Sequence, residues 1–228
     1  MPAISNAAKK DRKVNTLIIS GGNISSDFAL DFMEKQNIDY IIAADRGLAF
    51  ARRYGIRPDL IVGDFDSVSR EIIEGYRREG KVPIRTYNPV KDDTDTQIAL
   101  EKALEAGSSR IWILGGTGTR LDHVLGNICI LKQADRAGVP AFLVDEHNRI
   151  SLVSSRAVLK KEEQFGAYVS FLPLGDRAFG VNLTGFKYPL SDSVLTSDNS
   201  LGISNEITAD EACVSVQGGT LIMIESRD

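Results

Sequence analysis

The chain has 228 residues, of which 43% are hydrophobic and 25% are charged, and its formal net charge is −4. This composition is ordinary for a folded protein with one large or two modest cores, and we expect two domains. An acidic chain without a Lys/Arg-rich run excludes a general electrostatic attraction to nucleic acid or to an anionic membrane, so phosphate could be bound only locally.

The cysteines and the start of the chain also limit the possible classes of protein. Cys129 and Cys213 lie far apart in apolar surroundings and lack the spacing of zinc ligands, which favours reduced core thiols in a cytoplasmic protein. No apolar run reaches the length of about eighteen residues that spans a bilayer. Residues 1–13 are polar and lack the apolar segment of a signal peptide, so we predict a disordered tail there.

From residue 14 to residue 145, short β-branched runs alternate with helical patterns, as in βαβ units. The strand runs lack polar alternation, which is typical of parallel strands covered by helices on both faces. Strands are expected at 14–20, 40–43, 60–62, 83–86, 110–114 and 140–144, and helices at 26–36, 47–54, 70–78, 95–105 and 121–137. We therefore predict a Rossmann-like three-layer α/β domain with a parallel sheet at residues 14–146.

After residue 145, short segments with alternating polar and apolar residues are separated by turns. Strands are expected at 150–154, 167–172, 178–183, 212–216 and 220–225, and no helix of useful length fits. Residues 147–228 are thus predicted to form a C-terminal antiparallel β-sandwich or barrel domain. The stretch 190–205 is strand-poor, rich in Ser and Asp and too long for a simple hairpin turn, so we predict a functional loop.

The turns at the two ends of the predicted parallel strands differ in composition. Turns from helix to strand are generic, and the turns that begin at residues 54, 79, 106 and 137 each have Gly near the helix C-cap. The five turns from strand to helix carry groups suited to phosphate or metal, and all lie at the carboxyl edge of the sheet, where such folds bind ligands. Their residues are Gly21, Gly22, Asp45, Arg46, Gly47, Asp64, Asp66, Lys91, Asp92, Asp93, Thr94, Asp95, Gly115, Gly116, Thr117, Arg120, Asp122 and His123.

The most informative of these turns ends the apolar run 60–63 with two acids one residue apart. Side chains of an extended backbone alternate between faces, so Asp64 and Asp66 would share a face if the strand continues through them, with Gly63 leaving room for a ligand. Two close carboxylates repel, which implies a bound cation, a shared proton or a route to solvent. The alternative is an Asx turn that only closes the strand.

Two glycine-containing turns could hold phosphate. Gly21 and Gly22 precede a helix, so their amides could bind an anion, although the turn matches neither the dinucleotide nor the Walker motif. In the turn 115–120, three glycines and two hydroxyls precede Arg120, whose guanidinium can donate two hydrogen bonds to phosphate. A flexible loop is the alternative. His123 could bond a ligand or be satisfied locally.

The segment 91–97 combines a helix start with further acids. Thr94 and Gln97 match a capping box, which places Asp95 in the first helical turn. Because no Cys or His is grouped with these acids, the site offers only oxygen ligands, which suit Mg²⁺ bridged to polyphosphate. The remaining phosphate charge would be offset by Arg46, Lys91 and Arg120.

In order and spacing, these motifs resemble the thiamin pyrophosphokinase (thiamin diphosphokinase) family, from about residue 14 to the C-terminus. The resemblance implies a Mg²⁺-dependent enzyme that transfers the terminal diphosphate of ATP to the hydroxyethyl group of thiamin and releases AMP. It rests on Asp45-Arg46-Gly47, Pro58-Asp59, Gly63-Asp64-Phe65-Asp66-Ser67, Asp92 with Thr94-Asp95, Gly115-Gly116, Arg120-Leu121-Asp122-His123, Lys187-Tyr188-Pro189-Leu190 and Gly202-Ile203-Ser204-Asn205.

The resemblance also implies roles for individual residues. It places Asp64, Asp66 and Asp95 around the metal and the diphosphate as catalytic residues. Attack by an alcohol also calls for an acid near it to accept the proton, and for this role we choose Asp66 or Asp95. The nucleotide side would comprise Asp45, Arg46 and Arg120 together with the other polar and glycine residues of the turns, namely Gly21, Gly22, Gly47, Lys91, Asp92, Thr94, Gly115, Gly116, Thr117, Asp122 and His123.

Thiamin would be held in a homodimer, between the α/β domain of one subunit and the β domain of the other, with contacts from Gln97, Ser204 and Asn205. Some relatives present a tryptophan to thiamin, whereas the single tryptophan here, Trp112, lies in a predicted core strand. The residue that stacks on the aminopyrimidine ring is therefore open.

Two other functions fit the same acidic residues at the carboxyl edge of the sheet, which we call the acidic edge. One is a different Mg²⁺-dependent pyrophosphokinase or a phosphoesterase, which thiamin-dependent production of AMP would distinguish. The other is a non-catalytic nucleotide sensor, which would bind nucleotide without turnover.

Overall fold

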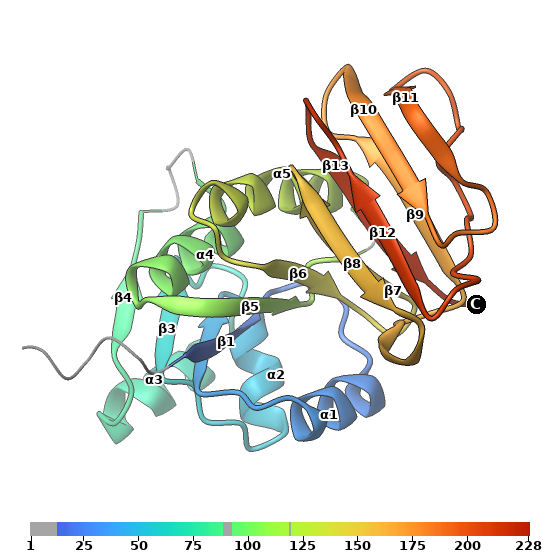
Figure 1. The fold of residues 1–228 in the computed structure, drawn as a ribbon. Helices are drawn as coiled ribbons and strands as arrows, with labels where there is room; N and C mark the ends of the chain where they lie inside the picture. Colours follow the sequence, from blue (N-terminus) through green and yellow to red (C-terminus); the bar gives the residue numbers. More distant parts are fainter. Residues whose placement is uncertain (1–12, 89–92, 119) are drawn as a thin grey trace, which may run out of the picture.

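The computed structural model describes residues 13–88, 93–118 and 120–228, and its N-terminal half is a parallel sheet between two layers of helices (Figure 1). The six predicted strands and five predicted helices of this half are confirmed, with ends that differ by no more than two residues. In sheet order the strands are β4 (Ile84–Thr86), β3 (Leu60–Gly63), β2 (Tyr40–Ala44), β1 (Val14–Ile19), β5 (Ser108–Leu114) and β6 (Ala141–Val144).

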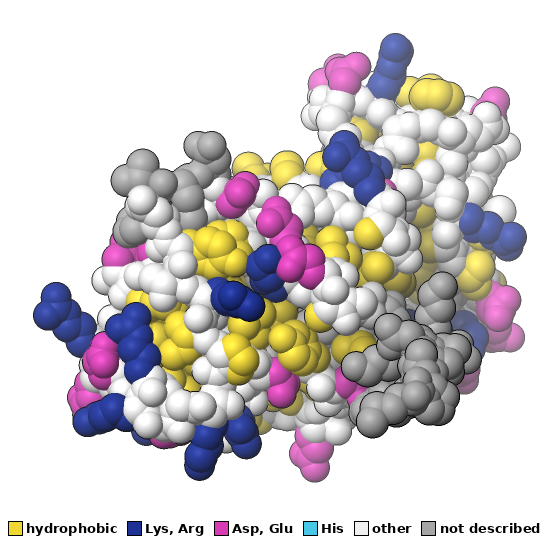
Figure 2. Space-filling model, turned by 90° about the vertical axis from the view of Figure 1, so that its left-hand side faces the viewer, with side chains coloured by type: hydrophobic (Ala, Val, Ile, Leu, Met, Phe, Trp, Pro, Cys, Tyr) yellow, Lys and Arg dark blue, Asp and Glu magenta, His cyan; other side chains and the backbone are white. Residues whose placement is uncertain are grey.

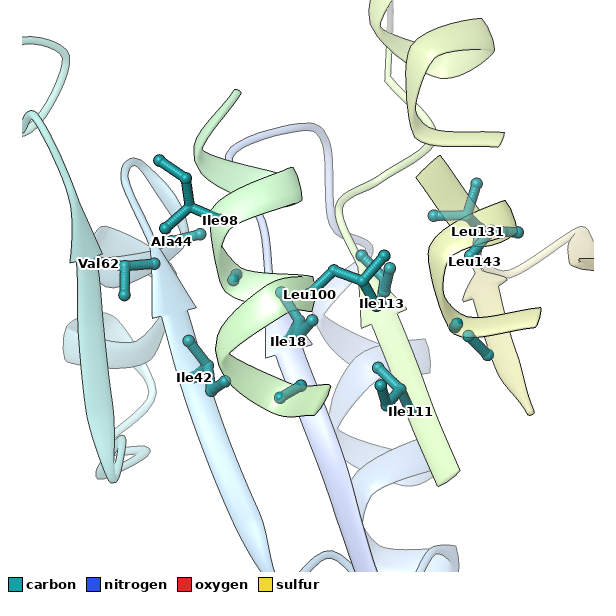
Figure 3. Packing of buried hydrophobic residues seen from close by; sticks show 14 of the residues in the cluster. Ile18, Ile42, Ala44, Val62, Ile98, Leu100, Ile111, Ile113, Leu131 and Leu143 are labelled. Atoms are coloured by element: carbon teal, nitrogen blue, oxygen red, sulfur yellow. The ribbon is translucent and has the colours of Figure 1, made fainter. Parts of the chain in front are cut away.

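The helices divide between the two faces of this sheet. One face packs on α4 (Asp95–Glu105) and α5 (Leu121–Arg136), and Figure 3 shows side chains of α4, including Ile98 and Leu100, lying over the strands. The other face packs on α1 (Ser26–Lys35), α2 (Gly47–Arg53) and α3 (Arg70–Glu79). Because both faces are buried there, the carboxyl-terminal parts of β1, β2, β3 and β5 are apolar runs, which explains the missing polar alternation.

The β half joins this sheet directly. Strand β7 (Asn148–Val153) pairs antiparallel with β6, followed by β13 (Leu221–Ser226) and β9 (Tyr168–Pro173), so one sheet of nine strands runs through both halves of the chain. A second sheet, in the order β11 (Leu190–Thr196), β10 (Arg177–Thr184), β12 (Glu211–Ser215) and β8 (Arg156–Lys160), packs on β7, β13 and β9 around a shared core. The predicted β-sandwich is therefore confirmed, and one of its layers continues the α/β sheet.

Two strands were absent from the sequence prediction. Strand β8 precedes a short 3₁₀ helix, Lys161–Glu163, and strand β11 occupies the first half of the predicted loop 190–205, so that part of the loop prediction is wrong. Strand β11 forms the edge of its sheet and is irregularly paired, with Leu195 buried and Val194 exposed. An edge strand with an exposed face tolerates Ser and Asp, which hides it in the sequence.

Two further observations concern the surface. Cys129 is exposed and Cys213 is half-buried, so the prediction of two core thiols is wrong for Cys129. None of the described helices has the length and apolar content that a membrane crossing requires. On the face shown in Figure 2, acidic and basic side chains are interspersed, and no broad basic area is visible.

Candidate active site

Three carboxylates meet at the carboxyl edge of the sheet. Asp45 follows β2, and Asp64 and Asp66 follow the neighbouring strand β3; one oxygen from each lies within 4.8 Å of the others. The structure thus brings Asp64 and Asp66 together as predicted and adds Asp45, which the resemblance had placed on the nucleotide side. Asp95, the third metal ligand implied by the resemblance, is not a member of this group.

The two acids after β3 come together through a turn. The strand ends at Gly63, and Phe65 has a positive φ of 63°, so the strand does not continue through the acids, and the condition for a shared face by alternation is not met. The backbone N–H of Asp66 donates to Oδ1 of Asp64 at 3.2 Å, which is the hydrogen bond of an Asx turn. Both readings of the motif therefore hold, because the Asx turn closes the strand and also points the two carboxylates at one place.

Gly63 serves packing between strand ends. A side chain at this position would meet the backbone of Asp45 at 3.3 Å, so the space beside Gly63 is filled by the end of β2 and offers no room for a ligand. This corrects the sequence prediction. The close approach of the two strand ends is what brings Asp45 to the pair of acids on β3.

Only one of the two carboxylate oxygens of Asp45 has a hydrogen-bond partner in the described structure. Its Oδ2 accepts a short hydrogen bond from the hydroxyl of Ser67, whereas its Oδ1 is buried and has no hydrogen-bond partner in the described structure. A buried carboxylate oxygen without a partner is unfavourable unless a cation or a donor meets it. Oxygen ligands grouped in this way suit a hard divalent cation such as Mg²⁺, so the residues present fit this metal.

Electrostatic repulsion within the group is visible in one pKa. The negative charge of Asp64 is the largest of the causes that raise the pKa of Asp66, followed by desolvation, the hydrogen bond with Asp64 and the charge of Asp45. A cation bound between these oxygens would remove the repulsion. The group is therefore arranged for a positively charged partner.

Glycines let three of the turns touch one another through their backbones. A Cβ on Gly22 would lie 2.4 Å from the carbonyl oxygen of Gly115, and the N–H of Gly22 donates to that oxygen at 3.0 Å. The prediction of a free Gly22 amide for anion binding is therefore wrong. A Cβ on Gly47 would lie 2.0 Å from the carbonyl oxygen of Ile19, which fixes α2 against the end of β1. Gly21 lies against Arg46.

The turn 115–118 is held from α5. Asn127, which is buried, donates from Nδ2 to the carbonyl oxygen of Gly116 at 2.8 Å, and Thr117 Oγ1 is buried without a hydrogen-bond partner in the described structure. Asn127 was not among the residues predicted for the site, although it is a polar residue on the buried face of a predicted helix. An unpartnered hydroxyl in a glycine-rich turn is available to a ligand.

Arg120 and Asp122 form a pair at the start of α5. Arg120 Nη2 and Nε donate to the two carboxylate oxygens of Asp122 at 2.6 and 3.2 Å, and both side chains are exposed. The hydrogen bond from Arg120 and the one from the backbone N–H of His123 hold the pKa of Asp122 below its ordinary value. Arg120 and Asp122, both predicted for the site, are therefore in contact, and this pair uses two of the five N–H donors of Arg120.

The start of α4 lies over the end of β1. The hydroxyl groups of Thr96 and Ser20 are hydrogen-bonded at 2.5 Å, which brings the first turn of α4, including Asp95, to the same edge as the carboxylates. Thr94 caps the helix by accepting from the N–H of Gln97, as predicted, and the Gln97 side chain donates to Asp93. Lys91 and Asp92 lie outside the described residues.

Asn205 has a different environment from the one expected. It is 3% exposed, and its side chain accepts from the N–H groups of Tyr188 and Glu206 and donates to the carbonyl oxygen of Tyr188. Its polar atoms are therefore directed at the protein backbone, while the side chain of Tyr188 is 58% exposed. Ser204 is exposed and has a positive φ of 56°.

Comparison with known proteins gives a consistent result for both halves of the chain. A family model described as "Thiamin pyrophosphokinase, catalytic domain" matches residues 33–143, and one described as "Thiamin pyrophosphokinase, vitamin B1 binding domain" matches residues 156–221. A thiamine pyrophosphokinase of Bacillus subtilis (strain 168) is 36% identical over 188 residues, which cover 82% of this chain and 87% of that protein.

Solved structures agree with this match. A crystal structure of thiamine pyrophosphokinase from Bacillus subtilis has a TM-score of 0.83 and 32% identity, covering 94% of this chain and 99% of that chain. A crystal structure of thiamin pyrophosphokinase from Geobacillus thermodenitrificans has a TM-score of 0.82 and 30% identity, covering 94% and 98%.

Proposed function

The chain belongs to the thiamin pyrophosphokinase family, and from this premise we propose that its acidic edge transfers the terminal diphosphate of ATP to the hydroxyethyl group of thiamin, with release of AMP. The observation that carries the proposal is the group formed by Asp45, Asp64 and Asp66, with its unpartnered Asp45 oxygen, at the edge where parallel sheets bind ligands. Diphosphate transfer needs a positioned, charge-shielded polyphosphate, and this edge offers ligands for the shielding cation.

Mg²⁺ would be held by Asp45, Asp64 and Asp66, with Asp95 in the first turn of α4 as a further candidate. When bound, the ion would neutralise charge on the polyphosphate. The protein itself contributes the geometry, since the Asx turn and the strand contact at Gly63 fix the carboxylates before any ligand arrives. Asp66 is our candidate for accepting the proton of the alcohol, because it is the exposed member of the group and can meet a substrate at the edge.

The nucleotide would lie along the glycine turns beside this group. Thr117 offers a hydroxyl without a partner, and Arg120 keeps three N–H donors beyond its pair with Asp122. Asn127 fixes the backbone of the turn by its bond to Gly116, which makes it a positioning residue. Arg46, which is exposed next to Gly21, supplies a second cation at the same edge.

Thiamin would be recognised by the β half, and we propose Tyr188 as the aromatic group that meets its ring. The Tyr188 ring is exposed, and Lys187 lies over it at 5.6 Å while pairing with Glu206. The Asn205 side chain accepts from the N–H of Tyr188 and donates to its carbonyl oxygen. We therefore assign Asn205 a positioning role in place of a direct contact with thiamin. Ser204, in the same turn, stays a candidate contact.

The activity test uses the purified chain with ATP, Mg²⁺ and thiamin. We expect thiamin diphosphate and AMP in equal amounts, no AMP without thiamin, and no turnover with EDTA in place of Mg²⁺. Phosphate release that does not depend on thiamin would indicate a phosphoesterase. Nucleotide binding without any product would indicate a sensor.

The proposed homodimer, with each thiamin site shared between subunits, can be tested by exchange. Asp66→Asn removes the acidic half of the site and Tyr188→Ala the thiamin half, so each variant alone should be inactive or weakly active. After subunit exchange, half of the dimers contain one intact site, and about a quarter of wild-type activity should return. Failure of activity to return, with exchanged dimers demonstrated by mass spectrometry, would show that each site is built within one chain.

The division of the chain at residue 146 and a cytoplasmic location also remain proposals. The division is supported by separate cores on the two faces of β7 and by the family models, one of which ends at residue 143 while the other begins at residue 156. A reducing, cytoplasmic setting is supported by the two cysteines, which are both free thiols in the structure.

A further inference from the structure

A cleft of about 770 Å³ lies between α1 and β8, away from the acidic edge. Its floor is formed by β5, β6, β7 and β13, and none of the residues assigned above to metal, nucleotide or thiamin lines it. Strands β6 and β7 pair at only two positions, so they diverge beyond them, and the cleft extends between them to Leu131 and Asp135 on α5. Its volume is in the range of about 300–1,000 Å³ that is common for small-molecule sites.

A continuous row of four aromatic rings forms one wall of this cleft. Trp112 on β5 contacts Phe32 edge-to-face at 6.0 Å between centroids, Phe32 contacts Phe28 at 5.7 Å, and Phe28 contacts Phe165 at 6.3 Å. Phe142 on β6 lies beside Trp112 in the sheet and also lines the cleft. Trp112 is 5% exposed, so the half-buried Phe28, Phe32, Phe142 and Phe165 supply the stacking surface for a planar ring.

The charges around the cleft differ from those of the whole chain. Five basic and four acidic side chains line it, although the chain as a whole has 27 basic and 31 acidic residues. Each of the four acids already has an ion-pair partner, since the pairs are Asp31 with Lys35, Asp135 with Lys132, Glu163 with Lys160 and Glu225 with Arg149. Within the described residues, this leaves Arg110 and Arg227 without a carboxylate partner.

The two unpaired arginines stand at opposite ends of the aromatic row. Arg227 lies over Phe165 at 4.7 Å and donates from Nε to the carbonyl oxygen of Glu146. Arg110 lies over Trp112 at 5.7 Å, and its guanidinium makes no hydrogen bond to any other described residue. Because Arg110 and Trp112 are two residues apart on β5, they point to the same face of the sheet. The Arg110 end therefore combines stacking surface with a cation that has all its donors available.

We propose that this cleft binds a small planar aromatic anion, with its ring against Phe32, beside the buried Trp112, and its negative group on Arg110. A guanidinium can donate two parallel hydrogen bonds to a carboxylate, sulfonate or phosphate group, and it stays charged at every relevant pH. The ring supplies contact area and the arginine supplies the selection for charge. Neither the acidic edge nor Tyr188 is needed for this binding.

The test uses 2-naphthalenesulfonate as the probe, because it is a planar aromatic anion without a phosphate group for the acidic edge. The chain has one tryptophan, so the indole N–H of Trp112 gives a single resonance in the ¹H–¹⁵N spectrum of the full-length protein. We expect this resonance to shift with saturation as probe is added. The neutral 2-naphthalenemethanol should bind roughly tenfold more weakly or worse, which is the loss of one charge-assisted hydrogen bond.

Two matched variants locate the charge. Arg110→Gln should weaken the sulfonate by roughly tenfold or more and leave the neutral alcohol unaffected, whereas Arg227→Gln, at the other end of the row, should change the sulfonate affinity by less than about twofold. Thermal unfolding checks that both variants are folded. The proposal is overturned if the Trp112 resonance does not shift, if the neutral alcohol binds as well as the sulfonate, or if Arg227→Gln has the larger effect.

Discussion

Replacing Asn205 by alanine should destabilise the protein and loosen Tyr188 together. Asn205 is 3% exposed and makes hydrogen bonds of 2.8 Å and 3.0 Å with the backbone of Tyr188 and one of 2.9 Å with the N–H of Glu206. At about 0.5–1.5 kcal/mol for each bond, the variant loses on the order of 1.5–4.5 kcal/mol of unfolding free energy. In a chain of this size each kcal/mol lowers Tm by about 2–4 °C, so a drop of roughly 3–18 °C is expected.

The assay combines thermal unfolding, followed by circular dichroism, with steady-state kinetics. For Asn205→Ala we expect the lower Tm and a raised KM for thiamin, with the KM for ATP unchanged. Tyr188→Ala removes an exposed side chain, so the unfolding free energy should stay within about 0.5 kcal/mol of wild type while the KM for thiamin still rises. Tyr188→Phe keeps the ring and should restore the KM, and Ser204→Ala, an exposed neighbour, should leave Tm unchanged.

The positioning role of Asn205 is tested by comparing the change in Tm with the change in the KM for thiamin. An Asn205→Ala protein with a wild-type Tm and a thiamin KM higher than that of Tyr188→Ala would refute it, because the amide would then act on thiamin directly. A lower Tm with an unchanged KM would instead show that the turn is structural only and that Tyr188 does not meet thiamin.

Three other changes test the acidic edge and its support. Asp66→Asn should lower Mg²⁺-dependent turnover by about a thousandfold, and full activity would remove Asp66 from the metal site. The same variant should have a higher Tm than wild type at pH 7 without Mg²⁺. The charge of Asp64 raises the pKa of Asp66 in the folded protein above its ordinary value of 3.8, so the ionised form of Asp66 destabilises the folded state. This difference in Tm should vanish as the pH falls through the raised pKa, because Asp66 is then protonated. Arg120→Ala should raise the KM for ATP more than that for thiamin, and the reverse order would contradict its place on the nucleotide side. Gly47→Ala should lower the unfolding free energy by several kcal/mol, of order 3 or more, because the new methyl group would meet the Ile19 carbonyl oxygen at 2.0 Å, and a wild-type denaturation curve would contradict this contact.

The α/β half could be predicted closely because the carboxyl-terminal parts of its central strands β1, β2, β3 and β5 are buried on both faces and form short apolar runs. The same reasoning failed at strand β11, whose exposed edge carries Ser and Asp, and at Asn205, whose burial no periodicity reveals. The sequence correctly predicts that the carboxylates of Asp64 and Asp66 lie close together, but the reason it offers is incomplete. Alternation along a strand predicts the shared direction, but the structure achieves it with an Asx turn whose geometry depends on Phe65 in a left-handed conformation.

The two edges of the parallel sheet follow local backbone rules to different degrees. At the opposite edge, four of the five helix-to-strand turns place a glycine where φ is positive, namely Gly55, Gly80, Gly107 and Gly138, and the fifth, after α1, ends the helix at Gln36 with a negative φ, so no side chain is strained there. At the acidic edge, Asp45 and Phe65 adopt positive φ values of 44° and 63° without being glycine, and Ser204 does the same at 56° in the β half. Strain of this kind persists only where the surrounding packing enforces it. Because the buried core can hold these residues against their own preferences, the carboxylates stay grouped despite their repulsion, and a cation that binds there does not have to assemble its own site.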